Sequence, residues 1–126
     1  MLVYDGAKFT PPAPVAQVIV RSPKTDDSVA NVPMLIDTGA DVTLLPREPI
    51  PELLTSADSG DEYELEGFDG TRSLAPSVLL KLRFLGRIFR GRFLVVDGTH
   101  GVLGRNVLNS IALSLDGPNQ TWEEWE

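Results

Sequence analysis

Frequent turn-forming residues divide this chain into short segments. Ten prolines and eleven glycines are spread over 126 residues, and β-branched residues, which favour strands, are common between them. Residues 15–21 and 32–36 are segments of this kind. Val78, Leu80, Leu82 and Phe84 recur with a period of two, with Lys81 and Arg83 between them and Leu79 as an exception. About seven short strands separated by turns predict a mostly-β closed sheet or barrel.

The second half of the chain adds further elements to this prediction. Residues 88–96 and 112–115 are expected to be strands, and residues 105–111 to be the one short helix, about two turns long. A hairpin is predicted around the two-residue turn Asp69-Gly70, with residues 63–68 and 71–74 as its arms. The acidic segment at residues 55–62 is expected to be a loop that leads into this hairpin.

The length suits one domain with one core. We expect an extended arm without regular structure at residues 1–14, where Pro11-Pro12-Ala13-Pro14 disfavours helix and sheet. The domain itself would occupy residues 15–117, followed by a C-terminal tail at residues 118–126. Trp122 and Trp125 in that tail either pack on the barrel or on a dimer seam, or belong to a frayed end.

The overall composition argues against several classes of function. A net charge of −7 disfavours nucleic acids and anionic membranes as partners. There is no apolar run of about 18 residues to span a membrane and no secretory signal pattern at the N-terminus. The absence of cysteine excludes disulfides and thiolate metal sites and fits a reducing, cytoplasmic location. The acidic residues near position 60 lack the spacing of a calcium loop, so we expect no metal or cofactor.

Residues 35–43 read Leu-Ile-Asp-Thr-Gly-Ala-Asp-Val-Thr and place a carboxylate directly after an apolar run. An Asp at the edge of a buried strand costs free energy unless it is hydrogen-bonded or shares a proton with a neighbour. Glycine lets the backbone turn sharply and brings its N–H close to the carboxylate. Asp37 is therefore the candidate catalytic acid and base. The alternative is a simple strand-ending turn, since Asp, Thr and Gly are all turn formers.

A second motif, Val102-Leu103-Gly104-Arg105-Asn106, opens the predicted helix. With both motifs in place and the Asp-Gly hairpin between them, the chain resembles the retropepsin-like aspartic proteases, the retroviral protease fold and its cellular relatives. In that family two apolar residues precede Asp-Thr/Ser-Gly-Ala, and an apolar pair followed by Gly-Arg-Asn/Asp precedes a helix. The resemblance covers residues 15–115 in order and spacing.

This resemblance implies a closed retropepsin-like β-barrel with one short C-terminal helix, active as a homodimer. It assigns the catalytic positions to Asp37, Thr38 and Gly39: Asp37 supplies one carboxylate, Thr38 hydrogen-bonds across the dimer, and Gly39 lets the substrate backbone approach. It also implies that Arg105 pairs with Asp41 and braces the loop. The residues implied to support the site are Gly104, Arg105 and Asn106. The residues implied to contact substrate are Ala40, Asp41, Val42, Gly67, Phe68, Asp69, Gly70 and Val102.

The mechanism of such a protease needs two aspartates, and the chain has one Asp-Thr-Gly. A symmetric homodimer in which each subunit gives one Asp37 meets this need. Two charged carboxylates about 3 Å apart, at an effective dielectric of about 20, repel by about 5 kcal/mol. One proton is therefore shared, and the pair titrates as a unit. The protonated member acts as an acid toward the peptide carbonyl, and the ionised member activates a water molecule.

The leading hypothesis is thus an aspartic endopeptidase that cleaves extended peptides between apolar residues. Val42, Phe68 and Val102 would line its apolar cleft if they are placed as in the family. One alternative is a retropepsin-fold binding or scaffold module with weak catalysis. Another is an unrelated β-barrel in which the Asp-Thr-Gly turn is accidental.

Overall fold

The computed structural model describes residues 1–56, 59–67 and 69–125. The strands are β1 Leu2–Val3, β2 Val15–Arg21, β3 Ser28–Ile36, β4 Leu44–Pro46, β5 Ser59–Glu66, β6 Arg72–Phe84, β7 Arg87–Val96, β8 Gly101–Leu103, β9 Leu113–Asp116 and β10 Thr121–Glu124. The helices are α1 Pro51–Ser56 and α2 Arg105–Leu108. Neither of these helices is long and apolar enough to cross a membrane.

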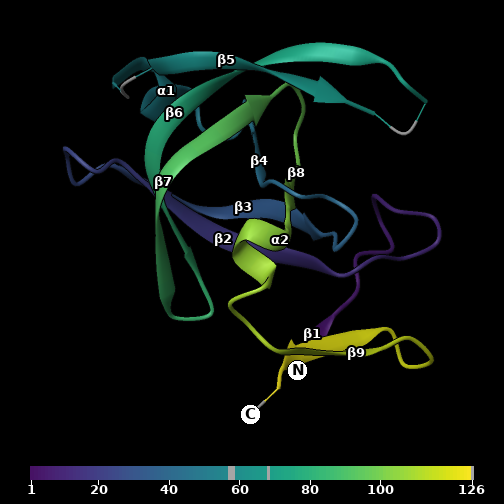
Figure 1. Cartoon of the computed structure of the whole chain (residues 1–126). Coiled ribbons are helices and arrows are strands. Elements are labelled where there is room, and N and C mark those ends of the chain that lie inside the picture. Colours follow the sequence, from purple (N-terminus) through teal and green to yellow (C-terminus); the bar gives the residue numbers. More distant parts are fainter. Residues whose placement is uncertain (57–58, 68, 126) are drawn as a thin grey trace.

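The larger sheet closes on itself into a barrel (Figure 1). Its strands follow the order β2-β3-β8-β4-β7-β6, and pairing between β2 and β6 completes the circle. The last strand of this sheet, β5, pairs with β6 and forms with it a long hairpin that projects from the barrel. The sequence-based prediction of a mostly-β closed barrel with a short C-terminal helix is confirmed.

Alternate residues of the strands fill the barrel. Along β6, Val78, Leu80, Leu82 and Phe84 are buried, whereas the charged residues between them stay outside. This period of two is the consequence of strand geometry, because successive side chains point to opposite faces. Removing these apolar side chains from water is the main favourable contribution to folding.

Several elements differ from the prediction; β3, for example, begins at Ser28 rather than at residue 32, and Pro51–Ser56 form a helix, α1. The expected pair of strands around Pro76 is one continuous strand, β6, and Pro76 lies beside a register shift in the β5–β6 ladder, where proline is tolerated. The expected loop at residues 55–62 is wrong at both ends, because α1 extends to Ser56 and β5 already begins at Ser59. The C-terminal helix ends at Leu108, and residues 109–111 continue as tighter turns closed by bonds such as Ile111 N–H to the Leu108 carbonyl (3.1 Å).

The two ends of the chain form a second sheet, in the order β1-β10-β9 (Figure 1). Residues 1–14 therefore contain a strand where none was expected, since Leu2 pairs with Trp122 in the tail. Trp122 is 2% exposed and packs against Phe84, with ring centroids 6.1 Å apart. Of the alternatives for the two tryptophans, Trp122 packs on the barrel, whereas Trp125 is exposed.

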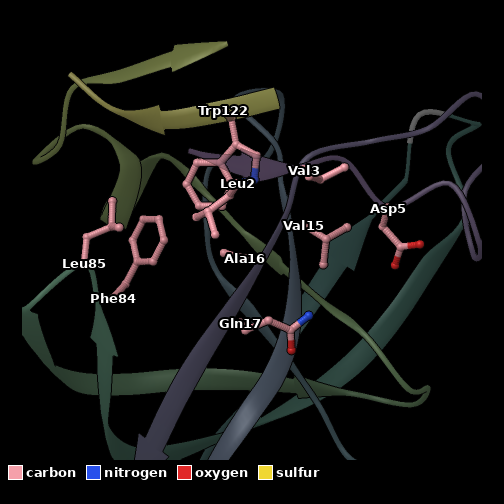
Figure 2. A pocket seen from close by; sticks show the side chains of 9 residues that line it. All are labelled: Leu2, Val3, Asp5, Val15, Ala16, Gln17, Phe84, Leu85 and Trp122. Atoms are coloured by element: carbon pink, nitrogen blue, oxygen red, sulfur yellow. The ribbon is translucent and has the colours of Figure 1, made fainter. Parts of the chain in front are cut away.

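A cavity of about 340 Å³ separates this terminal sheet from the barrel (Figure 2). Its lining comes from both bodies: Leu2 and Trp122 from the terminal sheet, and Val15 and Phe84 from the barrel. The buried indole N–H of Trp122 has no hydrogen-bond partner among the described residues. The Trp122 ring therefore contributes an apolar contact between the terminal sheet and the barrel, and no described hydrogen bond from its indole N–H.

Candidate active site

Asp37 stands where β3 leaves the barrel. Its backbone N–H donates to the carbonyl of Leu103 (3.2 Å), and its own carbonyl accepts from the N–H of Ala40 (3.2 Å). The N–H of Gly39 donates to Oδ1 of Asp37 (2.9 Å). The Asp37 side chain is half-buried. The tight turn therefore fixes one carboxylate oxygen, and the other has no hydrogen-bond partner among the described residues.

The two sequence motifs lie side by side because β3 and β8 pair in parallel. Leu35 is in register with Val102, and Ile36 with Leu103. Gly104 follows directly and passes close to the loop backbone: a Cβ at this position would lie 2.3 Å from the carbonyl oxygen of Val42. Real side chains do not tolerate such an approach, so only glycine lets the second motif pack against the first.

Arg105 joins the helix to the catalytic loop, but through a partner that the sequence did not predict. Its guanidinium donates to the Thr38 carbonyl (2.7 Å), and its backbone N–H donates to the Ala40 carbonyl (2.9 Å). The expected pairing of Arg105 with Asp41 is wrong, since the structure records no ion pair between these two described residues and Asp41 is exposed. The tight turn leaves carbonyl acceptors without strand partners, and the guanidinium satisfies one of them.

Thr43 is a supporting residue that the sequence reasoning missed. It is 1% exposed, its hydroxyl donates to Oδ1 of Asn106 (2.7 Å), and it accepts the N–H of Gly104 (3.0 Å). The signal was a lone hydroxyl residue inside the apolar run Val42-Thr43-Leu44-Leu45. A buried hydroxyl is nearly always hydrogen-bonded, so such a residue predicts a specific partner without identifying it.

The tip of the β5–β6 hairpin, which we call the flap, is longer than the expected two-residue turn, because β5 ends at Glu66 and β6 begins at Arg72, which leaves five residues between the strands. The N–H of Gly67 donates to the Thr71 carbonyl (2.9 Å), and the N–H of Gly70 donates to the Gly67 carbonyl (3.0 Å). Gly70 has a φ of 83°, in the left-handed region that favours glycine. Phe68, predicted to contact substrate, lies outside the described residues.

Asp69 organises the flap turn through its carboxylate. Oδ1 accepts hydrogen bonds from the hydroxyl of Thr71 (2.7 Å) and from its backbone N–H (3.0 Å). The hydroxyl bond is the main cause that lowers the pKa of Asp69, and the backbone bond adds to it. The charged form of Asp69 is therefore the one that closes this turn.

A recess of about 190 Å³ lies beside the catalytic loop. Val42 and Leu94 give it apolar walls, and the rest of its lining is Thr43, Tyr63, Ser77, Arg92 and Asn106. Among the predicted substrate contacts, Val42 lines this recess and Val102 does not: Val102 lies on β8, paired with Leu35 and Leu44. The hydroxyl of Ser77 is buried there without a hydrogen-bond partner among the described residues, and no sequence pattern predicts this.

The closed barrel, the flap hairpin and the Asp-Thr-Gly loop braced by a short helix define a retropepsin-like fold. Residues 11–116 match the family model described as retroviral aspartyl protease, and the chain belongs to that family. A solved structure described as EIAV protease complexed with the inhibitor HBY-793 superposes with a TM-score of 0.57. It is 24% identical, with 86% of this chain and 93% of that chain covered, a likeness that concerns the fold. A comparison with curated proteins gives no match.

Proposed function

We propose that this protein is an aspartic endopeptidase that works as a homodimer, with one Asp37 from each subunit in a shared active site. The observation that carries this proposal is the fixed Asp37 carboxylate, held by the Gly39 N–H in a chain of the retroviral aspartyl protease family. The chain has a single Asp-Thr-Gly. Activity as a homodimer is consistent with this family.

In the proposed dimer the two Asp37 carboxylates share one proton. The ionised carboxylate takes a proton from a water molecule as the water attacks the peptide carbonyl, and the protonated carboxylate donates to the carbonyl oxygen. The Gly39 N–H orients the carboxylate that it contacts. Arg105 keeps the loop in place through the Thr38 carbonyl, and the exposed Thr38 side chain is left to face the partner subunit.

The proposed substrate is an extended peptide held between the catalytic loop and the flap. An extended chain fits this space because strands can hydrogen-bond it through the backbone, while recesses accept alternate side chains. Val42 and Leu94 support a preference for apolar residues, since they line the recess beside the catalytic loop. Gly67, Asp69 and Gly70 would cover the peptide from the flap side.

The test is cleavage of apolar extended peptides by the wild type, Asp37→Asn and Asp26→Asn. Asp37→Asn removes the carboxylate with little change in shape and is expected to abolish cleavage. Asp26→Asn is the matched control, because Asp26 is an exposed carboxylate paired with Arg21 outside the site. Equal cleavage by wild type and Asp37→Asn would contradict the proposal. A wild type that dimerises and binds such peptides without cleaving them would instead support the binding module.

A further inference from the structure

The terminal sheet β1-β10-β9 carries much of the apolar surface that the described chain leaves exposed. Val3 is 75% exposed, Leu115 is 53% exposed, and Trp125, which follows β10, is 67% exposed. Met1 and Leu2 are exposed beside them. Among these residues Leu115 lies on β9 itself, so an apolar side chain is exposed on the strand with the free edge.

The hairpin β9–β10 is anchored on its own barrel. Trp122 packs on Phe84, and Glu124 pairs with Arg87 at the turn between β6 and β7. The N–H of Trp125 donates to the carbonyl of Ala112 (2.8 Å), which closes the open end of the hairpin. These contacts come from separate parts of the chain, and together they hold the hairpin in one orientation on its own subunit.

The N-terminal strand is also held within the chain. Leu2 and Val3 pair with Trp122 and Thr121, and the next N–H, that of Tyr4, donates to the carbonyl of Gln120 (2.8 Å). The place beside β10 that a partner's strand could take is therefore filled by β1 of the same chain.

The two edges of the terminal sheet differ in what they offer a second copy. The β1 edge is two residues long, and short edge strands protect a sheet from pairing. The β9 edge is four residues long and pairs with β10 on one side, with no described strand on the other. An open row of backbone N–H and carbonyl groups is a template for another strand, and a two-fold axis lets β9 pair with itself in antiparallel fashion.

The position of β9 suits a seam next to the active site. Residues 109–112 connect it directly to α2, whose first residue, Arg105, bonds to the loop that carries Asp37. Figure 1 shows the terminal sheet next to α2, at the end of the barrel away from the flap hairpin. A two-fold axis that brings two Asp37 residues together can therefore run close to β9.

We propose that the homodimer forms through the free edge of β9, with each subunit keeping its own β1. The result is one continuous sheet, β1-β10-β9 of one subunit followed by β9-β10-β1 of its partner. This inference rests on the proposed function, because the shared active site is what requires a second copy. It excludes an exchange of terminal strands between the subunits.

Two matched substitutions on opposite edges of the sheet test this seam. Leu115→Glu places one negative charge from each subunit at the seam between the two β9 strands. The repulsion is expected to raise the dimer Kd at least about tenfold in sedimentation equilibrium. Val3→Glu places the same charge on the β1 edge and is expected to leave the Kd within about twofold. Circular dichroism verifies that both variants remain folded. A dimer that survives Leu115→Glu, or that dissociates equally with Val3→Glu, overturns the proposal.

Cysteine cross-links provide a second test, because the chain has no cysteine of its own. Val3 and Thr121 are register partners, so oxidation of Val3→Cys/Thr121→Cys is expected to give a linked monomer on a non-reducing gel. Ser114→Cys alone, on β9, is expected to give a covalent dimer. A covalent dimer from the double variant that neither of its single variants forms means that the strands are exchanged and overturns the proposal.

Peptide cleavage measured on the same samples separates the seam from the function. A wild type that dimerises through β9 without cleaving contradicts the protease and leaves the seam standing. A cleaving dimer that only Val3→Glu dissociates contradicts the seam and leaves the protease standing.

Discussion

The hydroxyl of Thr43 donates to Oδ1 of Asn106 at 2.7 Å and accepts the N–H of Gly104 at 3.0 Å. This one buried side chain ties the strand after the catalytic loop to the start of α2. The two sequence motifs are thus joined by more than the pairing of β3 with β8. The stability of the site should depend on this contact.

Replacing Thr43 by valine tests this dependence. The shape is kept, but the buried Gly104 N–H loses its acceptor, and a buried unsatisfied group costs about 1–3 kcal/mol. We expect Thr43→Val to lower the free energy of unfolding by that amount in urea titrations and to reduce cleavage. Thr43→Ser keeps the hydroxyl and should lose less unfolding free energy and less cleavage activity than Thr43→Val. Equal stability of Thr43→Val and the wild type would show that the contact is not needed.

Gly104 should tolerate no side chain. A Cβ there would lie 2.3 Å from the Val42 carbonyl oxygen, so Gly104→Ala must push the catalytic loop away from β8. We expect a loss of about 1–3 kcal/mol or more in unfolding free energy, the range of overpacked cores. Gly91→Ala on β7 is the control, since its added Cβ would meet nothing within 4 Å. If both variants melt at the same temperature, the close packing of the two motifs is not required.

The flap turn should weaken in acid. Because the hydrogen bonds from Thr71 lower the pKa of Asp69 in the folded hairpin, they stabilise the turn at pH values above the ordinary carboxyl pKa. That stabilisation is lost as the pH falls through the lowered pKa of Asp69. An NMR titration of the Asp69 carboxyl, with hydrogen exchange of the Thr71 amide, measures both effects.

Two variants identify what lowers the pKa of Asp69. Thr71→Val removes the hydroxyl donor and keeps the N–H, so the pKa of Asp69 should rise part of the way toward its ordinary value. Asp69→Asn should remove the pH dependence of Thr71 exchange. A pKa of Asp69 that is the same in Thr71→Val and in the wild type would mean that the hydroxyl bond does not form in solution.

The sequence was sufficient to predict the barrel, because turn-forming residues and a strand period of two are local signals. The period from Val78 to Phe84 corresponds to the buried face of β6. The sequence did not predict the start of β5 correctly. Glu62, Tyr63 and Glu64 on this strand are all exposed, and a strand with both faces in water needs no apolar pattern. The terminal sheet was predicted only in part: the strand expected at residues 112–115 corresponds to β9, whereas β1 is two residues long, too short for any period.

The site could be predicted as residue types but not as contacts. Asp37 and Gly104 are identified by their motifs, because a carboxylate after an apolar run and a glycine at a close approach are unusual in sequence. The motif does not identify the partner of Arg105, because the choice between the Asp41 carboxylate and the Thr38 carbonyl depends on how the loop turns. Thr43 and Ser77 are ordinary residues until the packing around them is known.

The central claim is that two chains build one active site, and mixing subunits tests it most directly. Wild type and Asp37→Asn are combined at increasing ratios, allowed to exchange subunits, and assayed at constant total protein. If each site needs two Asp37 residues, activity follows the square of the wild-type fraction, so that an equimolar mixture keeps about a quarter of it. Activity proportional to the wild-type fraction, about half in that mixture, would contradict the shared site.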